Sequence, residues 1–189
     1  MNKHRKDRKE ALEYMAMAEG YDGRLIIDQL ETYVKPGSAV LELGMGPGKD
    51  LDLLAEKYRV TGSDLSEAFL DLYREKNPGA NLLHLDAVTL DTTETFDCIY
   101  SNKVLHQIGP DDLKRSFERQ SALLNPAGIA CHSFWYGDKV VTHRGQQFWY
   151  YTELTIRSVV PPDFDIVFQH RYMEMIPNDS IWMIFRVKK

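Results

Sequence analysis

The segment Val40-Leu41-Glu42-Leu43-Gly44-Met45-Gly46-Pro47-Gly48 decides the fold of this chain. The apolar run over 39–43 has one acid near its end, which is typical of a strand buried on both faces of a parallel sheet. Three glycines at alternate positions permit a tight turn and let the backbone approach a ligand closely. Helical spacing begins at Lys49, with apolar residues on one face. A strand, a glycine turn and a helix in this order predict a nucleotide-sized site beyond the carboxyl end of the strand.

The glycine spacing separates three kinds of cofactor site. A dinucleotide fingerprint has glycine at the first, third and sixth positions, whereas here the third glycine is Gly48 at the fifth position and Lys49 takes the sixth. A phosphate-binding Walker loop needs Ser or Thr after Gly-Lys, but Asp50 follows here. Glu42 would repel a pyrophosphate and suits a cationic or amino-bearing ligand.

The stretch from Glu42 to Gly48 has the form acid–x–Gly–x–Gly–x–Gly, which resembles the first motif of the class I S-adenosylmethionine-dependent methyltransferases. Later motifs of the family follow in the expected order, and the resemblance spans about residues 21–187. One turn departs from the pattern, because Ala127 stands where the family usually has glycine. The resemblance implies S-adenosylmethionine as cofactor and S-adenosylhomocysteine as product.

Two acids follow the next two predicted strands. Asp64 ends a strand over 58–63, where a carboxylate can accept strong hydrogen bonds from both ribose hydroxyls. The alternative is that it caps the helix expected over 67–76, although Ser66 fits that cap better. Asp86 follows a strand over 81–85 and could be only a turn residue. The resemblance implies instead that Asp86 contacts the adenine amino group, with the backbone of Ala87 nearby.

The segment 96–106 is interpreted as a fourth strand and its exit. It resembles the fourth motif of the family, which implies that Ser101 supplies backbone near the sulfur. His106 is the candidate catalytic base, because neutral imidazole can accept a proton near neutral pH. The alternative is a histidine that only shapes the pocket wall, and we place it ahead because many enzymes of this family need no base.

The other cofactor contacts are also implied by the resemblance. Glu42 would assist at the amino group of the cofactor, directly or through water. The backbone of the glycine turn would lie against the methionine part. The predicted cofactor-binding residues are Glu42, Gly44, Gly46, Gly48, Asp64, Leu65, Asp86, Ala87 and Ser101.

Aromatic residues flank a polar connection expected over 137–147. Related methyltransferases build the wall of their acceptor site here, and aromatic faces can hold a flat or cationic acceptor. We expect most of these rings to belong to the core and one or two to touch the acceptor. The sequence leaves open which of them do so: Trp135, Tyr136, Phe148, Trp149 and Tyr150.

The predicted fold is α/β, a three-layer Rossmann-like sandwich whose mostly parallel seven-stranded sheet closes with an antiparallel C-terminal β-hairpin. The last two strands, over 164–175 and 181–187, are joined by a short link and so must pair antiparallel or flank one another. We expect one methyltransferase domain over 1–189. Its helices within 1–35 would cover the cofactor site, and 36–189 would form the core.

Composition narrows the partners and the location. The chain has 189 residues, a formal net charge of −5 and no apolar run as long as a membrane span. Its basic start, over 1–10, is expected to be solvated or frayed. Cys98 and Cys131 lie in apolar runs without metal spacing, so we expect reduced core cysteines in a cytoplasmic protein, without a metal site. The acidic balance argues against nucleic acid and favours a small-molecule acceptor; the oligomeric state stays open.

The sequence thus predicts an enzyme that moves a methyl group to an N, O or S nucleophile of a small-molecule acceptor. One alternative is a non-catalytic S-adenosylmethionine-binding protein, which no residue excludes. A second alternative is an NAD(P)-dependent oxidoreductase. The missing sixth-position glycine and the predicted terminal hairpin count against it.

Overall fold

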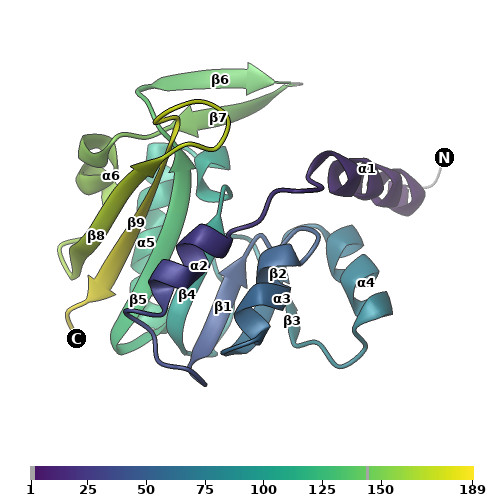
Figure 1. Ribbon diagram of the computed structural model, residues 1–189, viewed down its shortest axis with the longest axis horizontal. Helices are drawn as coiled ribbons and strands as arrows, with labels where there is room; N and C mark the ends of the chain where they lie inside the picture. The colour runs from purple at the N-terminus through teal and green to yellow at the C-terminus, as the bar shows by residue number, and fades with distance from the viewer. Residues whose placement is uncertain (1–2, 144) are drawn as a thin grey trace.

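The computed structural model of the chain describes residues 3–143 and 145–189, and within them one sheet has the strand order β3-β2-β1-β4-β5-β9-β8 (Figure 1). Its strands are β1 (Ala39–Leu43), β2 (Arg59–Asp64), β3 (Leu82–His84), β4 (Phe96–Asn102), β5 (Leu124–Trp135), β8 (Phe164–Tyr172) and β9 (Ser180–Val187).

The register brings the ends of the parallel strands to one edge. Glu42 of β1 lies opposite Gly62 of β2 and Tyr100 of β4, and β3 and β5 extend the parallel part on either side. The last strand, β9, runs antiparallel to both β5 and β8. The predicted fold class is therefore confirmed, including the antiparallel C-terminal pair.

Helices cover both faces of the sheet. They are α1 (Lys3–Met17), α2 (Arg24–Leu30), α3 (Lys49–Ala55), α4 (Glu67–Lys76), α5 (Pro110–Leu123), α6 (Glu153–Val159) and the short 3-10 helix η1 (Leu105–Gln107). In Figure 1, α2 and α3 lie in front of the sheet and α5 lies behind it. The front core joins Leu30 of α2 to Val40 and Tyr100, and the rear core joins Phe117 of α5 to Phe185.

The helix starts follow local chemistry. Pro110 opens α5 and two acids follow it in the first turn, where the helix dipole favours negative charge. Thr152 caps α6, because its side chain accepts the Thr155 amide N–H and the Thr155 hydroxyl accepts the amide N–H of Thr152. Ser66 lies at the N-cap of α4, but its side chain makes no capping hydrogen bond within the described part of the chain. The expectation that Ser66 caps this helix is therefore wrong at the level of the side chain.

The predicted polar connection over 137–147 is instead a β-hairpin. Strands β6 (Lys139–His143) and β7 (Gln146–Tyr150) pair antiparallel and lie across the carboxyl edge of the main sheet (Figure 1). Gln146 bonds Gln107 over 2.7 Å, and Trp149 packs beside Gly109. The alternation was hidden in the sequence because every residue of β6 is exposed, so no apolar face marks the strand.

Other boundaries also differ from the predicted ones. The first helix begins at Lys3, inside the segment expected to be solvated or frayed. The strand expected over 164–175 ends at Tyr172. Ala127 has φ +60°, a left-handed conformation that costs an alanine about 1 kcal/mol relative to the glycine usual at this turn. Within the described residues, each helix is too short or too polar to cross a bilayer.

Candidate cofactor and acceptor site

The turn between β1 and α3 holds three glycines in left-handed conformations. Their φ values are +64° at Gly44, +49° at Gly46 and +83° at Gly48, a region that residues with a side chain rarely adopt. A Cβ on Gly44 would lie 2.6 Å from a methyl of Val104, and one on Gly48 would overlap the ring of Tyr73. Backbone angle and space both require glycine here, so the turn presents bare main chain at the edge of the sheet.

Glu42 is a buried acid just before this turn. It is 3% exposed, and its Oε2 has no hydrogen-bond partner among the described residues. Burial raises the pKa of Glu42 well above its usual range, and the nearby carboxyl groups of Asp50 and Asp64 raise it further. An unsatisfied buried acceptor costs about 1–3 kcal/mol, so this position favours a ligand that brings a hydrogen-bond donor or a positive charge.

Asp64 lies beside the turn at the end of β2. Its Oδ2 accepts the amide N–H of Gly46 over 2.9 Å and its Oδ1 accepts that of Ser66 over 2.8 Å. Burial raises the pKa of Asp64, although these two amide bonds oppose the shift. Leu65 follows with an exposed side chain, and its carbonyl oxygen bonds the ring of His84 over 2.8 Å.

The third strand tip carries Asp86 and Ala87. The Oδ1 atom of Asp86 accepts the amide N–H of Val88 over 2.7 Å, which is the geometry of a turn residue. The carbonyl oxygen of Ala87 accepts the hydroxyl of Ser116 over 2.6 Å. Asp86 is therefore a turn residue in the structure, and its contact with adenine stays a prediction.

A buried chain of hydrogen bonds joins this loop to Ser101. The hydroxyl of Ser101 lies 2.8 Å from Nδ1 of His132, and Nε2 of His132 lies 2.8 Å from Oε1 of Gln120. The Gln120 amide then donates to Ser116 over 3.1 Å, and Ser116 donates to the Ala87 carbonyl. Burial lowers the pKa of His132 to about 3, so the ring is neutral with one donor and one acceptor. The hydroxyl of Ser101 is used in this series of hydrogen bonds, so only the backbone of Ser101 is left to contact a ligand at the tip of β4.

Helix α1 covers the glycine turn with a residue that the sequence analysis missed. A ring carbon of Tyr14 lies 3.9 Å from the position of a Cβ on Gly46, and the ring packs edge-on against Phe69 of α4. Lys49 donates to the carbonyl oxygen of Ala18 over 2.8 Å, which fastens the end of α1 beside the turn. A single tyrosine in a polar helix carries no motif, so only the fold could place Tyr14 here.

Asp50 is a second acid that the sequence analysis did not assign. It is buried, and its Oδ1 accepts the amide N–H of Gly23 over 2.6 Å. Its Oδ2 accepts the hydroxyl of Tyr100 over 2.8 Å and the amide of Asn102 over 3.1 Å. Asp50 therefore ties the start of α2 to the tip of β4, and these three hydrogen bonds offset the cost of its burial.

On the acceptor side, His106 is buried among aromatic rings. It is 4% exposed, with ring centroids 5.5 Å from Phe148 and 6.4 Å from Trp135. Its Nδ1 has no hydrogen-bond partner among the described residues. Burial lowers the pKa of His106 to about 3, and the charge of Lys103 lowers it further. His106 is therefore neutral at physiological pH and a weak base.

The five aromatic candidates divide by their contacts. Trp135 and Phe148 flank His106, and Tyr150 stacks on Trp135 at 6.3 Å. Trp149 packs against the rear core, and Tyr136 lies under the guanidinium of Arg171 at 4.0 Å. Two rings thus flank the histidine directly and Tyr150 backs one of them, whereas Trp149 and Tyr136 hold the hairpin and the sheet edge together.

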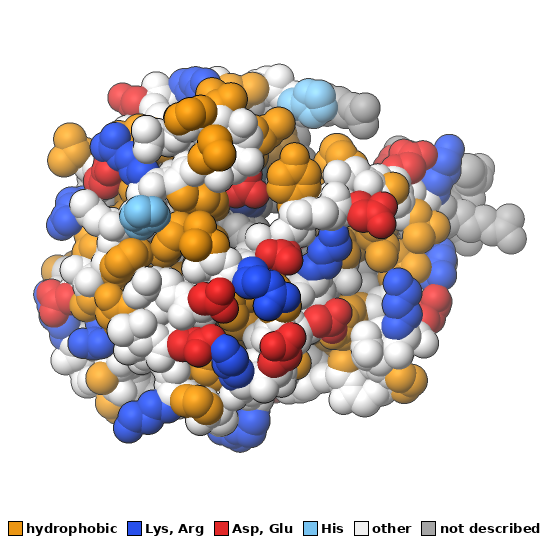
Figure 2. All heavy atoms as spheres, in the orientation of Figure 1, with side chains coloured by type: hydrophobic (Ala, Val, Ile, Leu, Met, Phe, Trp, Pro, Cys, Tyr) orange, Lys and Arg blue, Asp and Glu red, His pale blue; other side chains and the backbone are white. Residues whose placement is uncertain are grey.

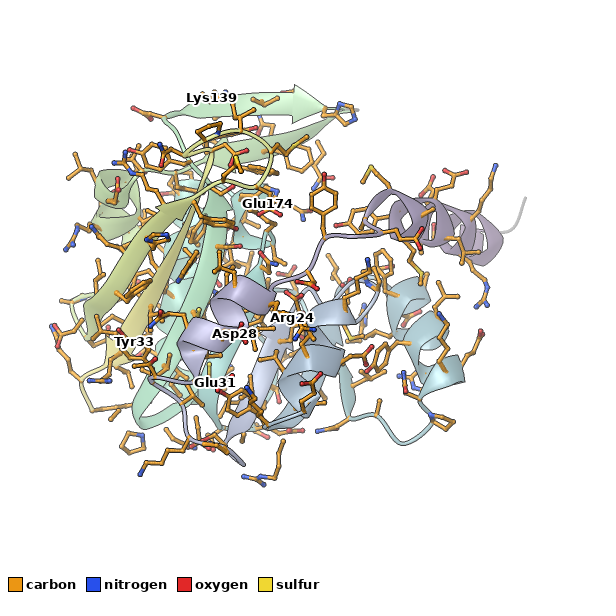
Figure 3. The ribbon with its side chains drawn as sticks, in the orientation of Figure 1. Arg24, Asp28, Glu31, Tyr33, Lys139 and Glu174 are labelled. Carbon is orange, nitrogen blue, oxygen red and sulfur yellow. The ribbon has the colours of Figure 1, made fainter. Side chains whose placement is uncertain are left out.

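Lys103 is a partly buried cation next to this cluster, which no motif indicated. Its Nζ donates to the Ser180 hydroxyl over 2.5 Å, pairs with Glu174 at 3.5 Å and lies 3.8 Å from the Trp135 ring centre. The two charged side chains are only 15% and 18% exposed. Burial lowers the pKa of Lys103 to about 8, and the acids Glu174 and Asp179 oppose this shift. Figure 3 places Glu174 at the carboxyl edge of the sheet, on the side that faces α1.

The charged groups on the outer surface are arranged differently. Acidic and basic side chains alternate over α2 and α3 in Figure 2, including Arg24, Asp28 and Glu31, which are labelled in Figure 3. Within the described residues, no group of three His, Cys, Asp or Glu side chains could hold a metal ion. Cys98 and Cys131 are free and buried, as expected of core cysteines.

Comparison with known proteins agrees with this geometry. A family model described as "Methyltransferase domain" matches residues 40–128. A trans-aconitate 2-methyltransferase of Paracidovorax citrulli is 36% identical over 97 residues, which are 49% of this chain and 36% of that protein. A malonyl-[acyl-carrier protein] O-methyltransferase of Legionella pneumophila is 30% identical over 101 residues, 50% of this chain and 36% of that protein. The matched part of the chain thus spans about a third of these relatives.

Solved structures extend the comparison to nearly the whole chain. An S-adenosylmethionine-dependent methyltransferase of Clostridium acetobutylicum superposes with a TM-score of 0.78 at 14% identity, over 94% of this chain and 98% of that one. At this identity the likeness shows the fold alone. The matched family model and the fold, from the glycine turn to the antiparallel C-terminal strands, both support a class I S-adenosylmethionine-dependent methyltransferase family.

Proposed function

We propose that this chain binds S-adenosylmethionine at the glycine turn and transfers its methyl group to a small-molecule acceptor. The observation that carries the proposal is the bare turn beside Glu42, whose buried Oε2 has no partner among the described residues. The ammonium group of the cofactor would supply the missing donor and the positive charge. The names of the two bacterial relatives support methyl transfer to an acid or to a carrier-bound acid.

The residues present fit the remaining parts of this cofactor. Asp64 keeps acceptor capacity for the ribose hydroxyls, because each carboxylate oxygen can accept more than the single amide bond it now holds. Asp86 uses Oδ1 for its turn, so we assign Oδ2 to the adenine amino group, with the backbone of Leu65 and Ala87 alongside. The backbone of Ser101 is assigned to the sulfur end.

When bound, the cofactor supplies an electrophilic methyl group on a positively charged sulfur. The residues of the chain then position the two reactants, which can contribute several kcal/mol, on the order of 7–11 in well-aligned systems. His106 is a poor base with its low pKa, so we assign it to the wall of the acceptor site. This assignment adopts the wall alternative for His106 instead of proton removal.

The N-terminal helices and the sheet are assigned different roles. We treat 1–189 as one methyltransferase domain in which 1–35 covers the cofactor and 36–189 is the core. The contact of Tyr14 with the glycine turn supports the covering role. The free, buried pair Cys98 and Cys131 is in keeping with the reducing cytoplasm.

Two rival functions make different predictions about binding. An NAD(P)-dependent oxidoreductase would need close approach of a pyrophosphate at the sixth motif position, where Lys49 instead bonds Ala18. A non-catalytic protein would bind the methyl donor without turnover. We therefore propose isothermal titration of the full chain with S-adenosylmethionine, S-adenosylhomocysteine and NAD. Micromolar binding of the first two with no heat from NAD supports the cofactor, and the reverse pattern overturns it.

Turnover is tested separately from binding. The chain would be incubated with methyl-labelled S-adenosylmethionine and a deproteinised bacterial extract that supplies small-molecule acceptors. Formation of S-adenosylhomocysteine above the rate without extract supports catalysis. Tight cofactor binding with no product above that blank would favour the non-catalytic alternative.

A further inference from the structure

A partly buried lysine precedes the residue that packs against the part of the glycine turn assigned to the cofactor. Val104 packs its methyl groups where a Cβ on Gly44 would lie, and Lys103 is the residue before it. Lys103 itself has φ +54°, a left-handed conformation that is costly for a residue with a long side chain. The ammonium group of this residue contacts Trp135, Ser180 and Glu174. Lys103 thus follows the tip of β4 next to the residue that packs on the cofactor turn, and its charge lies against Trp135.

Lys103 and His106 share a wall. The Nζ of Lys103 lies 3.8 Å from the ring centre of Trp135, and the ring of His106 lies 6.4 Å from the same centre. The Nδ1 of His106 is buried without a partner among the described residues, so one hydrogen-bonding position in this wall is unused. A cation and an unused imidazole nitrogen on one aromatic ring form a polar anchor in an apolar surface.

Glu174 contacts the ammonium group from a segment whose backbone is held by Asp179, which accepts the amide N–H groups of residues 174–176. The segment links β8 and β9, and three of its apolar side chains are more than three-fifths exposed: Met173 at 65%, Met175 at 68% and Ile176 at 64%. Its carboxylate reaches Lys103 at 3.5 Å, longer than the 2.5 Å bond that Ser180 makes with the same nitrogen. The ion pair therefore joins the core of the sheet to an exposed segment, and its acid is the partner that a ligand could replace.

We propose that the acceptor is a small molecule with a carboxylate, which binds the Lys103 ammonium in place of the Glu174 carboxylate and receives the methyl group on one of its oxygens. This inference rests on the proposed methyltransferase function and names its substrate class. A carboxylate oxygen forms the new O–CH3 bond while the S–CH3 bond of the bound cofactor breaks. The electron pair of that bond stays on sulfur, and the products are a methyl ester and a neutral thioether.

The chemistry of the wall favours an acid over an amine or an alcohol. No proton moves when a carboxylate is methylated, and the base nearest to the site, His106, is too weak to remove one efficiently. A protonated amine would also meet the like charge of Lys103, whereas a carboxylate is drawn to that charge and to the sulfonium. The rings of Trp135 and Phe148, which flank His106, would pack against the body of the acceptor.

Treating the products with mild base identifies their chemical class. Labelled methyl esters then release volatile labelled methanol, whereas methylated amines keep the label. The chain would be given methyl-labelled S-adenosylmethionine with trans-aconitate, fumarate, benzylamine or phenol, and with the deproteinised bacterial extract. We expect base-labile label from an acid or from the extract. Base-stable label, or no base-labile label from any of these sources, overturns the inference.

Three variants separate an anchor for the acceptor from a purely structural ion pair. Lys103→Met should lower kcat/KM for the base-labile reaction at least 30-fold, Lys103→Arg should restore most of it, and Glu174→Gln should lower KM about two- to tenfold because the competing charge is gone. A structural pair would instead respond alike to loss of either partner. Equal losses in Lys103→Met and Glu174→Gln would therefore overturn the inference.

Binding of S-adenosylhomocysteine is measured in parallel for every variant. We expect its Kd to change less than threefold in Lys103→Met, which also reports that the variant is folded. Lys57→Met serves as the matched control, since it breaks an exposed lysine–glutamate pair with Glu31 outside the site. If the wild-type chain does not bind S-adenosylhomocysteine, the proposed function is wrong. If it binds but forms only base-stable product, the carboxylate acceptor alone is wrong.

Discussion

Gly46 donates its amide N–H to Oδ2 of Asp64 over 2.9 Å, so the acid at the tip of β2 holds the glycine turn that follows β1. One carboxylate therefore shapes the turn and faces the position assigned to the ribose. Its second oxygen fixes Ser66 at the start of α4. Loss of this single charge would disturb both halves of the cofactor site.

Asp64→Asn should weaken binding of S-adenosylhomocysteine by about 10- to 100-fold, because a hydrogen bond to a charged group is worth about 1.5–3 kcal/mol. Isothermal titration at constant ionic strength measures the change. Asp71→Asn is the control, since Asp71 is an exposed acid on α4 that pairs with Arg74. Affinity within twofold of wild type in Asp64→Asn would remove Asp64 from the site.

Gly48→Ala and Gly37→Ala separate backbone strain from lack of space. Both glycines have nearly the same φ, +83° and +81°, but a Cβ on Gly48 would overlap Tyr73 whereas one on Gly37 meets nothing within 4 Å. We expect Gly37→Ala to lose about 1–2 kcal/mol of unfolding free energy and to bind the cofactor normally. Gly48→Ala should lose more and bind at least tenfold more weakly. Equal behaviour of the two variants in urea denaturation and titration would contradict this account.

Glu42 should release a proton when the cofactor binds. Its pKa is raised well above the usual range in the free protein, and an ammonium group beside it would favour the ionised form. The observed binding enthalpy should then vary with the ionisation enthalpy of the buffer, and the slope gives the number of protons released. Glu42→Gln should remove this buffer dependence, because glutamine has nearly the shape of glutamate but carries no ionisable proton. A slope near zero in the wild-type chain at pH 6–8 would show that Glu42 does not change its ionisation.

Acid should destabilise the fold through His106 and His132. The pKa of each is lowered to about 3, below the ordinary 6.5, so from pH 6.5 down to about 3 the unfolded chain binds more protons than the folded one. Stability is therefore lost as the pH falls through this window, by up to about 1.4 kcal/mol per pH unit for each histidine. Urea denaturation at pH 7, 6 and 5 should show a smaller decline in His106→Phe than in the wild type. Parallel declines would mean that His106 titrates normally.

Methylation of a carboxylate acceptor should decline above pH 8. The pKa of Lys103 is lowered to about 8, and only the protonated amine attracts the acid. The groups that face it are Glu174 and Asp179 from the segment after β8, Tyr172 of β8 and His106 of η1. The profile of kcat/KM should fall through pH 8 in the wild type and stay flat in Lys103→Arg, whose guanidinium remains charged. The same alkaline decline in Lys103→Arg would assign it to another group.

Local patterns were sufficient for the sheet and the glycine turn. The strand and turn around Glu42 could be predicted from residue type. A strand buried on both faces requires a run of apolar residues, and a turn with positive φ favours glycine. The acceptor side could not, because Lys103 and Glu174 come from distant parts of the chain and meet only when β8 and β9 are added to the sheet edge. The hairpin β6–β7 was missed for a related reason, since every residue of β6 is exposed and no buried face sets an alternating pattern in that strand.

The hydrogen-bonded chain from Ser101 through His132, Gln120 and Ser116 to Ala87 has a consequence for sequence divergence. Each member makes the hydrogen bond that its neighbour needs inside a space that excludes water. Replacing an inner member with an apolar residue would therefore leave the polar atoms on both sides of it without a partner. Natural variants that have lost one link should therefore have lost the others as well, with apolar side chains filling the same volume. These positions would drift as a set, although they come from strands, a helix and a loop far apart along the gene.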